Sequence, residues 1–513
     1  MNMILFIMIL LPLCAAAVML AFPGGHRLAR SLAISVTGVT LGAALLLLVA
    51  FDRAASGMQF SAAIPWLPDF GMNLTVGVDG ISLATLLLTA LVAFAGSLVS
   101  QGVRVRERQF YALYLALTGG AFGAFATTNL FFFYFFAEFE VLCSYLLITG
   151  WSRQPAEESN RAALQMTLFV AAGAVVTLLG FLVLSVWGGT FDMGGLQTLV
   201  RTHPLPVLWQ KSLFVMFLAG FGVLLSIWPL HVWAPPAYVA APTPVSMLSA
   251  GVLKQLGAYG LLRITLPLLP EGAHWAAPGL AILAGVNILY AGWIALRQRE
   301  WKWLISYGAI SHAGYILLGL AALNSLGQAG VVLMMYSGAL SVALLFALAG
   351  TVEEQAGTGD IASFSGLARR APFIGGCLVM AALAAAGLPG FAGFVSEIMV
   401  LAGAWVEGSL LLRVAAAAGA WGLVLTAVYM LWAVRKGVFG PPAADIMKVL
   451  DMRSLKSRLP YLILVGALLV VGIWPRLLSD PVRCGAGAIP GLVQERVDPL
   501  PGSPCGCSVE KFK

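Results

Sequence analysis

Long apolar segments with almost no charge dominate this chain. Of its 513 residues, 60% are hydrophobic and 10% are charged, whereas a soluble globular protein has about 25% charged residues. A water-soluble fold is therefore excluded. Since a helix needs about 20 residues to cross a ~30 Å hydrocarbon core, the sequence predicts an all-α polytopic membrane protein with about 14 transmembrane helices. The predicted spans are 3–22, 31–51, 81–101, 110–127, 128–149, 164–187, 212–235, 243–266, 276–297, 303–322, 328–350, 373–403, 411–435 and 458–478.

The basic residues between the spans predict an orientation. Most of the 29 Lys and Arg residues lie in the connections after the first, third, fifth, ninth, eleventh and thirteenth spans. Cytoplasmic loops are enriched in Lys and Arg. We therefore expect a multi-pass protein of the inner (cytoplasmic) membrane with both termini on the non-cytoplasmic side. The first span has no basic segment before it, so we expect a retained helix and not a cleaved signal.

Prolines interrupt two of the spans. They are Pro229, Pro235 and Pro236 near the end of the seventh span and Pro389 inside the twelfth. Proline breaks a helix, and the freed backbone is tolerated in lipid only where protein or water covers it. Because the interruptions lie five spans apart, they predict two inverted five-helix repeats with two broken helices, as in secondary transporters. The expected parts are 1–109 (helices 1–3), 110–266 (first repeat, helices 4–8), 267–435 (second repeat, helices 9–13) and 436–513 (helix 14 and an irregular tail).

Few ionisable residues remain inside the spans. They are Glu138 and Glu140 in the fifth span, Lys254 in the eighth, Glu397 in the twelfth, His231 at the first interruption and His312 in the tenth. A charge at the bilayer centre costs at least about 2.5–3.5 kcal/mol. A static ion pair between helices is one interpretation. A proton relay through Glu138, Lys254, His312 and Glu397 explains more, because it accounts for ionisable groups at a common depth on separate helices.

Glu140 and His231 are further candidates, as relay groups or as residues that line water. Glu140 lies about 200° around the helix from Glu138, so the two carboxylates cannot face the same partner. We expect Glu138 to be the relay group and Glu140 to line another water pocket or face a neighbouring subunit. His231 either carries protons or caps the loosened backbone. His312 either carries protons, since an imidazole titrates near neutrality, or makes a structural hydrogen bond.

Motifs for redox chemistry, hydrolysis and metal binding are absent from the sequence. Its six cysteines lack the spacing of a zinc or iron–sulfur site, and it has no dinucleotide or phosphate loop. We therefore expect no catalytic residue, no cofactor and no metal site. Any energy source for ion movement must come from another polypeptide. In the tail, Cys505 and Cys507 leave a disulfide with a partner, a weak metal site or disorder open.

Several stretches within spans 3 to 12 resemble the antiporter-like subunits of respiratory complex I, most closely the M-type (subunit 4-type) chain of NADH:quinone oxidoreductase. They are Gly77-Val-Asp-Gly-Ile-Ser-Leu83, 131–151, Pro229-Leu-His-Val-Trp233, Ala241-Pro-Thr-Pro-Val-Ser246, 253–263, Lys302-Trp-Leu-Ile-Ser-Tyr307, Ser311-His-Ala-Gly314 and 387–397. The resemblance implies fourteen helices in inverted five-helix repeats. It also implies a proton-translocating membrane subunit without a redox centre of its own.

The resemblance also implies roles for single residues. Glu138 would be the helix 5 glutamate, Lys254 the central helix 8 lysine and Glu397 the helix 12 acid. The chain departs from the family pattern at the helix 7 lysine, where it has Leu224, at an aspartate after the break, where it has Pro236, and at a helix 11 histidine, where Ser337 or Gly338 stands. Glu138 thus lacks its usual cation. The chain is then either a variant pump that uses Glu140 instead, or a degenerate module that mainly scaffolds.

The expected mechanism is a relay across the membrane midplane. Protons would enter from the cytoplasmic side, reach Lys254 through water near Glu138, pass through His312 to Glu397 and leave on the far side. The expected partners are other membrane and peripheral subunits of a multisubunit complex, protons and the lipid bilayer, with no nucleic acid. Two alternatives stay open: a Mrp-type cation/proton antiporter subunit, and a membrane partner of a soluble enzyme such as a hydrogenase or an inorganic-carbon uptake complex.

Overall fold

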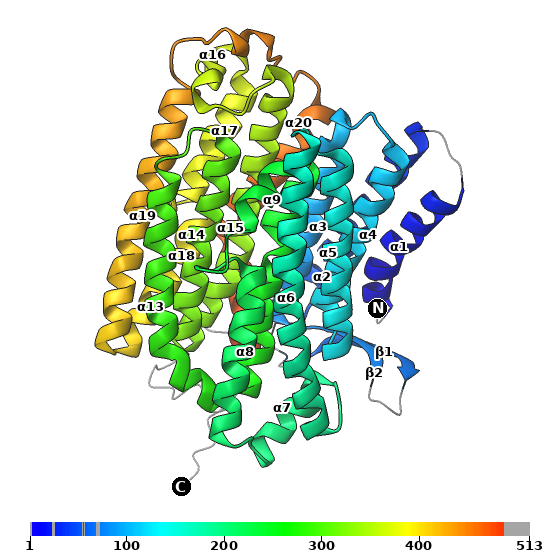
Figure 1. Cartoon of the computed structure of the whole chain (residues 1–513), viewed down its shortest axis with the longest axis vertical. Coiled ribbons are helices and arrows are strands. Elements are labelled where there is room, and N and C mark those ends of the chain that lie inside the picture. The colour runs from blue at the N-terminus through cyan, green and yellow to red at the C-terminus, as the bar shows by residue number, and fades with distance from the viewer. Residues whose placement is uncertain (1–2, 23–25, 54, 56, 68–71, 487–513) are drawn as a thin grey trace.

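The computed structural model of the chain describes residues 3–22, 26–53, 55, 57–67 and 72–486. The expected irregular tail beyond residue 486, with Cys505 and Cys507, lies outside these residues. Figure 1 shows helices that run side by side along the long axis of the molecule. In the described part of the chain, eleven helices are long and apolar enough to cross a membrane. The predicted all-α membrane architecture is confirmed.

Most of the predicted spans correspond to one uninterrupted helix each. These helices are α1 (Ile4–Ala21), α2 (His26–Ala50), α3 (Gly80–Val99), α4 (Glu107–Ala126), α5 (Leu130–Trp151), α6 (Ala156–Gly188), α13 (Pro270–Ala295), α14 (Trp301–Ala321), α15 (Ser325–Ala356), α19 (Leu410–Gly437) and α20 (Leu455–Ile473). Helices α3, α4, α14 and α15 are almost wholly buried, whereas the other helices of this set bury less than half of their most apolar segment. The molecule therefore has a central group of helices inside an apolar outer layer.

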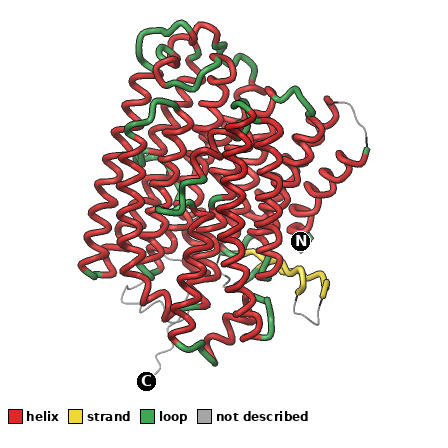
Figure 2. The backbone as a smooth tube through the Cα atoms, in the orientation of Figure 1, coloured by secondary structure: helices red, strands yellow, loops and turns green. Residues whose placement is uncertain are grey.

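Both predicted interruptions are present. The seventh span consists of α8 (Val207–Leu225), a non-helical segment and α9 (Ala234–Ala240). The twelfth consists of α17 (Pro372–Ala385), a turn with Gly387 and Gly390 at positive φ, and α18 (Ala392–Glu407). Figure 2 shows loop segments inside the helical body as well as at its ends. The breaks thus open the backbone within the body of the bundle.

The eighth span departs from a regular helix, which the sequence did not predict. It consists of α10 (Thr243–Leu248), a π-helical stretch (Ser249–Leu253), α11 (Gln255–Gly260), a second π-helical stretch (Leu261–Thr265) and α12 (Leu266–Leu268). Lys254 lies between the first stretch and α11. Such wide turns shift the direction of the side chains that follow them and are frequent at functional sites.

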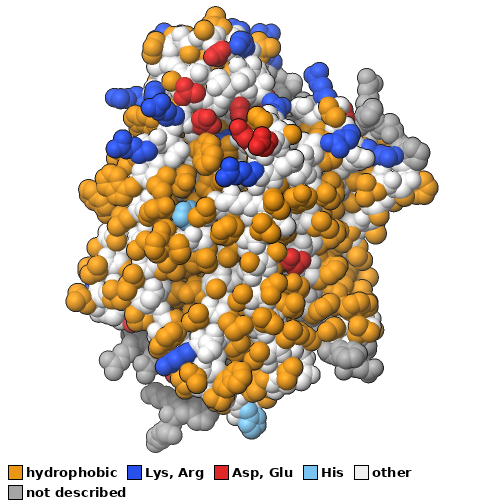
Figure 3. All heavy atoms as spheres, in the orientation of Figure 1, with side chains coloured by type: hydrophobic (Ala, Val, Ile, Leu, Met, Phe, Trp, Pro, Cys, Tyr) orange, Lys and Arg blue, Asp and Glu red, His pale blue; other side chains and the backbone are white. Residues whose placement is uncertain are grey.

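Smaller elements lie at the two ends of the bundle. Strands β1 (Gln59–Leu67) and β2 (Met72–Val78) form an antiparallel hairpin that the sequence did not predict. The short helices are α7 (Met193–Thr202), α16 (Leu367–Arg370) and α21 (Arg476–Ala486). In Figure 3 hydrophobic side chains cover the middle of the visible face, and most Lys and Arg side chains gather toward the end that carries α16. The count of fourteen crossings, the inverted repeats, the four-part division and the orientation stay predictions.

Candidate functional site

A cavity of about 40 Å³ lies between α5, α6, the interrupted seventh span and the eighth span. Its polar wall residues are Glu140, Ser144, Trp233, Tyr238, Ser249 and Lys254. The other wall residues are apolar and include Leu224, the position where the resemblance implies a lysine. The cavity therefore has an acid and a lysine of two different spans on the wall of one small space.

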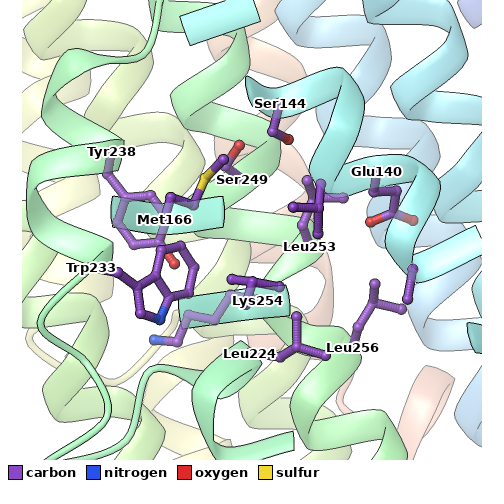
Figure 4. A pocket seen from close by; sticks show the side chains of 13 residues that line it. Glu140, Ser144, Met166, Leu224, Trp233, Tyr238, Ser249, Leu253, Lys254 and Leu256 are labelled. Carbon is purple, nitrogen blue, oxygen red and sulfur yellow. The ribbon is translucent and has the colours of Figure 1, made fainter. Parts of the chain in front are cut away.

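Lys254 is the basic residue on this cavity. Its side chain is 4% exposed, and its Nζ donates a hydrogen bond to the carbonyl of Ala309 in α14. Figure 4 shows its amine pointing away from Glu140. Lys254 thus lines the cavity with its stem, while its amine contacts the next helix of the predicted path.

The two glutamates of α5 occupy different environments, as their spacing predicts. Glu140 is 1% exposed and lines the cavity. Glu138 is only half-buried and is not a wall residue of the described cavity. Glu140 and Lys254 therefore line the same cavity, and Glu138 is not among the residues of its wall. A relay role for Glu138 stays a prediction.

His312 lies beyond Lys254, in the interior of α14. It follows Ala309 by three residues and therefore shares its face of the helix. It is 7% exposed, lies within electrostatic reach of Lys254 and contacts the backbone of Ala385 at the end of α17. A Cβ at Gly338 would lie 3.6 Å from its Nδ1. Gly338, which stands near the place of the helix 11 histidine that the resemblance implies, thus faces His312.

Glu397 lies in the second turn of α18, after the break. It is 2% exposed, and its Oε2 has no hydrogen-bond partner among the described residues. The phenols of Tyr315 and Tyr429 lie within electrostatic reach of its carboxylate. Tyr315 follows His312 by three residues, and their ring centroids are 6.4 Å apart. Tyr315 therefore contacts His312 and lies within electrostatic reach of Glu397.

A serine pair marks the same region. The Oγ atoms of Ser337 in α15 and Ser396 in α18 are 3.0 Å apart, and both side chains are fully buried. Ser396 precedes Glu397 directly. Hydroxyl groups thus occupy the space between α15 and the broken twelfth span.

His231 lies at the first interruption but is not a wall residue of the described cavity. It is 5% exposed, and its ring packs edge-on against Tyr290 at 5.4 Å. The break itself is held by Asn287 of α13, which accepts a hydrogen bond from the Trp228 backbone at 2.6 Å and donates one to the Ile310 carbonyl. Whether His231 carries protons or only packs at the break is untested.

Three polar residues of the interior were missed by the sequence reasoning. Ser144 follows Glu140 by four residues, and this helical spacing is a signal that could have identified it. Ser249 precedes Lys254 by five residues, so a 3.6-residue period does not place it on the face of Lys254. Asn287 gave no signal, because nothing local distinguishes it from an ordinary polar residue of a membrane helix.

Ion pairs lie away from the cavity. Arg263, in the second π-helical stretch, forms an ion pair with Asp79. Asp79 also caps the N-terminus of α3, because its carboxylate accepts a hydrogen bond from the Ser82 N–H. Lys302 pairs with Glu353 at 2.9 Å. Within the described residues, no group of three or more His, Cys, Asp or Glu could hold a metal ion.

Comparisons with known proteins point to one family. Residues 127–426 match the family model described as NADH:quinone oxidoreductase/Mrp antiporter, TM. NADH-quinone oxidoreductase subunit M of Rhodobacter capsulatus is 33% identical over 494 residues, which cover 94% of this chain and 95% of the relative.

Two solved structures have a similar fold. A chain of respiratory complex I from Thermus thermophilus superposes with a TM-score of 0.85 at 28% identity and covers 95% of this chain and 100% of its own. A chain of the Mrp complex from Dietzia sp. superposes with a TM-score of 0.84 over 95% of this chain and 97% of its own. The second likeness has 20% identity and shows the fold alone.

Proposed function

Because the chain belongs to the NADH:quinone oxidoreductase/Mrp antiporter transmembrane family, we propose that it is a proton-translocating membrane subunit of a complex I-type NADH:quinone oxidoreductase. Its relatives include a subunit M of an NADH-quinone oxidoreductase and a chain of respiratory complex I. In this proposal other subunits perform the redox chemistry, and this chain moves protons through the membrane.

The observation that carries the proposal is a series of buried ionisable groups on separate helices. Glu140 and Lys254 share one cavity, His312 lies within reach of Lys254, and Glu397 lies beyond it at the second break. Ionisable side chains inside a membrane are costly and mark proton or ion pathways. A static ion pair does not explain the series, because none of these four groups forms a salt bridge with another described residue.

Protons enter from the end where the basic residues gather, which we assign to the cytoplasm. They reach Lys254, pass by His312 and leave after Glu397. A change of charge at one group alters the proton affinity of the next, and this coupling transmits energy along the path. In this orientation both termini face the non-cytoplasmic side of the inner membrane.

The test is ion movement by the intact complex. A complex purified through a tag on this chain is reconstituted into liposomes, and NADH and a quinone start electron transfer. We expect flavin and iron–sulfur subunits in the preparation, and a pH change inside the liposomes that a protonophore abolishes. Replacing Na⁺ by K⁺ leaves this pH change unaltered. A pH change that requires Na⁺ would instead identify a cation/proton antiporter, and a preparation without redox subunits would contradict the proposed complex.

A further inference from the structure

Five buried aromatic rings pack together on one side of the cavity that Lys254 lines. They are Phe133 in α5, Phe181 in α6, Phe217 and Phe221 in α8 and Tyr259 in α11, and we call them the aromatic layer. Each ring is at most 1% exposed, and the centroids of contacting rings lie 5.4–6.4 Å apart. The helices that surround the cavity therefore meet again in one aromatic contact.

The aromatic layer begins one helical turn from the wall of the cavity. Three wall residues are each three or four positions from a ring on their own helix, and the pairs are Ala137 with Phe133, Leu224 with Phe221 and Leu256 with Tyr259. In Figure 4 the two leucines lie on the same side of the cavity.

All three rings lie toward the end of the bundle that carries α7 and the hairpin (Figure 1). Helix α5 begins beside β2, α8 begins after α7, and the eighth span ends with α12 against α7. In each pair the ring is the member nearer to this end. The aromatic layer therefore lies between the cavity and this end of the molecule.

Polar groups continue on the far side of the aromatic layer. The Tyr259 hydroxyl forms a hydrogen bond with Ser82 Oγ at 2.9 Å, and Arg263, one turn further along the eighth span, forms an ion pair with Asp79. Leu256 on the cavity wall and Arg263 are seven positions apart, which is about 10 Å along a helix. The aromatic layer thus separates two polar regions that a short file of water would otherwise connect.

The packing and chemistry of the rings exclude such water. A Cβ at Gly180 would lie 2.5 Å from the ring of Phe217, and a Cβ at Gly260 would overlap the ring of Phe221, so the helices approach the rings as closely as glycine allows. A buried water needs room and two to four polar partners. Apart from the Tyr259 hydroxyl, the side chains of the aromatic layer contain no polar atom.

We propose that the aromatic layer is a barrier that keeps protons in the Lys254 cavity from passing directly to the Arg263–Asp79 pair, so that they take the lateral route toward His312. The rings carry no proton themselves, and they determine the direction in which protons leave the cavity. Phe133 is the central ring, because it contacts Phe181, Phe221 and Tyr259. This inference rests on the proposed function, since a barrier matters only if protons reach the cavity.

The test measures passive proton entry in the absence of NADH. The intact complex is reconstituted into liposomes, a K⁺ gradient with valinomycin makes the interior negative, and an enclosed dye records the internal pH. We expect Phe133→Ser to acidify the interior several-fold faster than the wild type, because serine leaves space and supplies a hydroxyl that binds water. Phe221→Ser is expected to act in the same way. Rates equal to that of the wild type in both serine variants would overturn the barrier.

Two controls separate a barrier from a loss of packing. Phe133→Leu keeps an apolar side chain in the aromatic layer and should leak no more than the wild type. Phe110→Ser changes a ring that is equally buried but packs against Tyr111, Tyr114 and Trp151, outside the aromatic layer. Assembly of every variant is checked on native gels. A leak in either control as large as that in Phe133→Ser would overturn the barrier.

The same liposomes distinguish this inference from the proposed function. NADH and a quinone are added to the wild-type complex, and proton pumping is recorded. A wild-type complex that oxidises NADH without moving protons would contradict the proposed function. Normal pumping by the wild type, beside serine variants that show no added leak, would overturn the barrier alone.

Discussion

Gly387 makes room for the carboxylate of Glu397. A Cβ at position 387 would occupy the space of Glu397 Oε2, and Gly387 has a left-handed φ of 67°. The glycine that ends the first half of the broken twelfth span therefore lets the acid of the second half fold back onto the break. The position of Glu397, at the predicted end of the proton path, therefore depends on the conformation of the break.

Gly387→Ala is expected to displace Glu397 and to lower proton pumping by the complex. The matched control is Gly390→Ala, because Gly390 also has a positive φ, of 103°, but no atom lies within 4 Å of its Cβ position. Left-handed backbone costs a residue other than glycine about 1–2 kcal/mol, so both variants lose stability. Only Gly387→Ala should lose pumping, measured as pH change per NADH oxidised. Equal pumping by the two variants would contradict this relationship.

Asp79→Asn is expected to lower the free energy of unfolding by about 3–5 kcal/mol, because it leaves the buried charge of Arg263 without its partner. Asparagine caps helices as well as aspartate does, so the hydrogen bond from the Ser82 N–H is kept. The measurement is thermal unfolding of the complex in detergent. The double variant Asp79→Asn, Arg263→Met removes both charges and should recover most of the loss. A double variant as unstable as the single one would show that the charge pair is not the cause.

Asn287→Leu is expected to destabilise the break in the seventh span. The side chain of Asn287 accepts a hydrogen bond from the Trp228 N–H and donates one to the Ile310 carbonyl. Leucine can do neither, and each buried backbone group left unpaired costs about 1–3 kcal/mol. Hydrogen exchange of the residues around Trp228 should become faster, and the midpoint of thermal unfolding should fall. Unchanged exchange at this segment would mean that Asn287 does not hold the break.

Glu300 is expected to make stability depend on pH. It lies in the connection between α13 and α14, outside the membrane-spanning helices, where partial burial and the nearby Glu353 and Asp360 raise the pKa of its carboxyl. Because the pKa is higher in the folded state, protonation favours folding. This stabilisation is complete below the ordinary glutamate pKa and is lost as the pH rises through the raised one. Glu300→Gln should flatten this part of the curve of unfolding temperature against pH; an unchanged curve would contradict the assignment.

The sequence predicted the interruptions and the burial of Lys254 because these depend on local chemistry. Proline and glycine break helices wherever they stand, and a lysine in a long apolar run has nowhere else to lie. The π-helical stretch before Lys254 contains a close contact with a distant helix, since a Cβ at Gly251 would lie 3.1 Å from the Ala339 carbonyl of α15. Such a contact between distant segments leaves no periodic pattern in the sequence.

The choice between the two glutamates of α5 depends on packing as well. The resemblance favoured Glu138, and the helical spacing showed only that the two acids diverge. The rotation of α5 decides which of them meets the cavity, and Gly120 of α4 leaves the space for the stem of Glu140, since its Cβ position lies 3.0 Å from Glu140 Cγ. The sequence predicted no contact for Ser337 or Gly338, which lie against Ser396 and His312 respectively.

Proton pumping by the Lys254→Ala complex tests the central claim most directly. Reconstituted complexes with and without this substitution are compared at equal rates of NADH oxidation, and the pH change inside the liposomes is recorded. The account predicts that the variant moves fewer protons per NADH, because the only lysine on the cavity among the described residues is gone. An unchanged number of protons per NADH would contradict a path through Lys254.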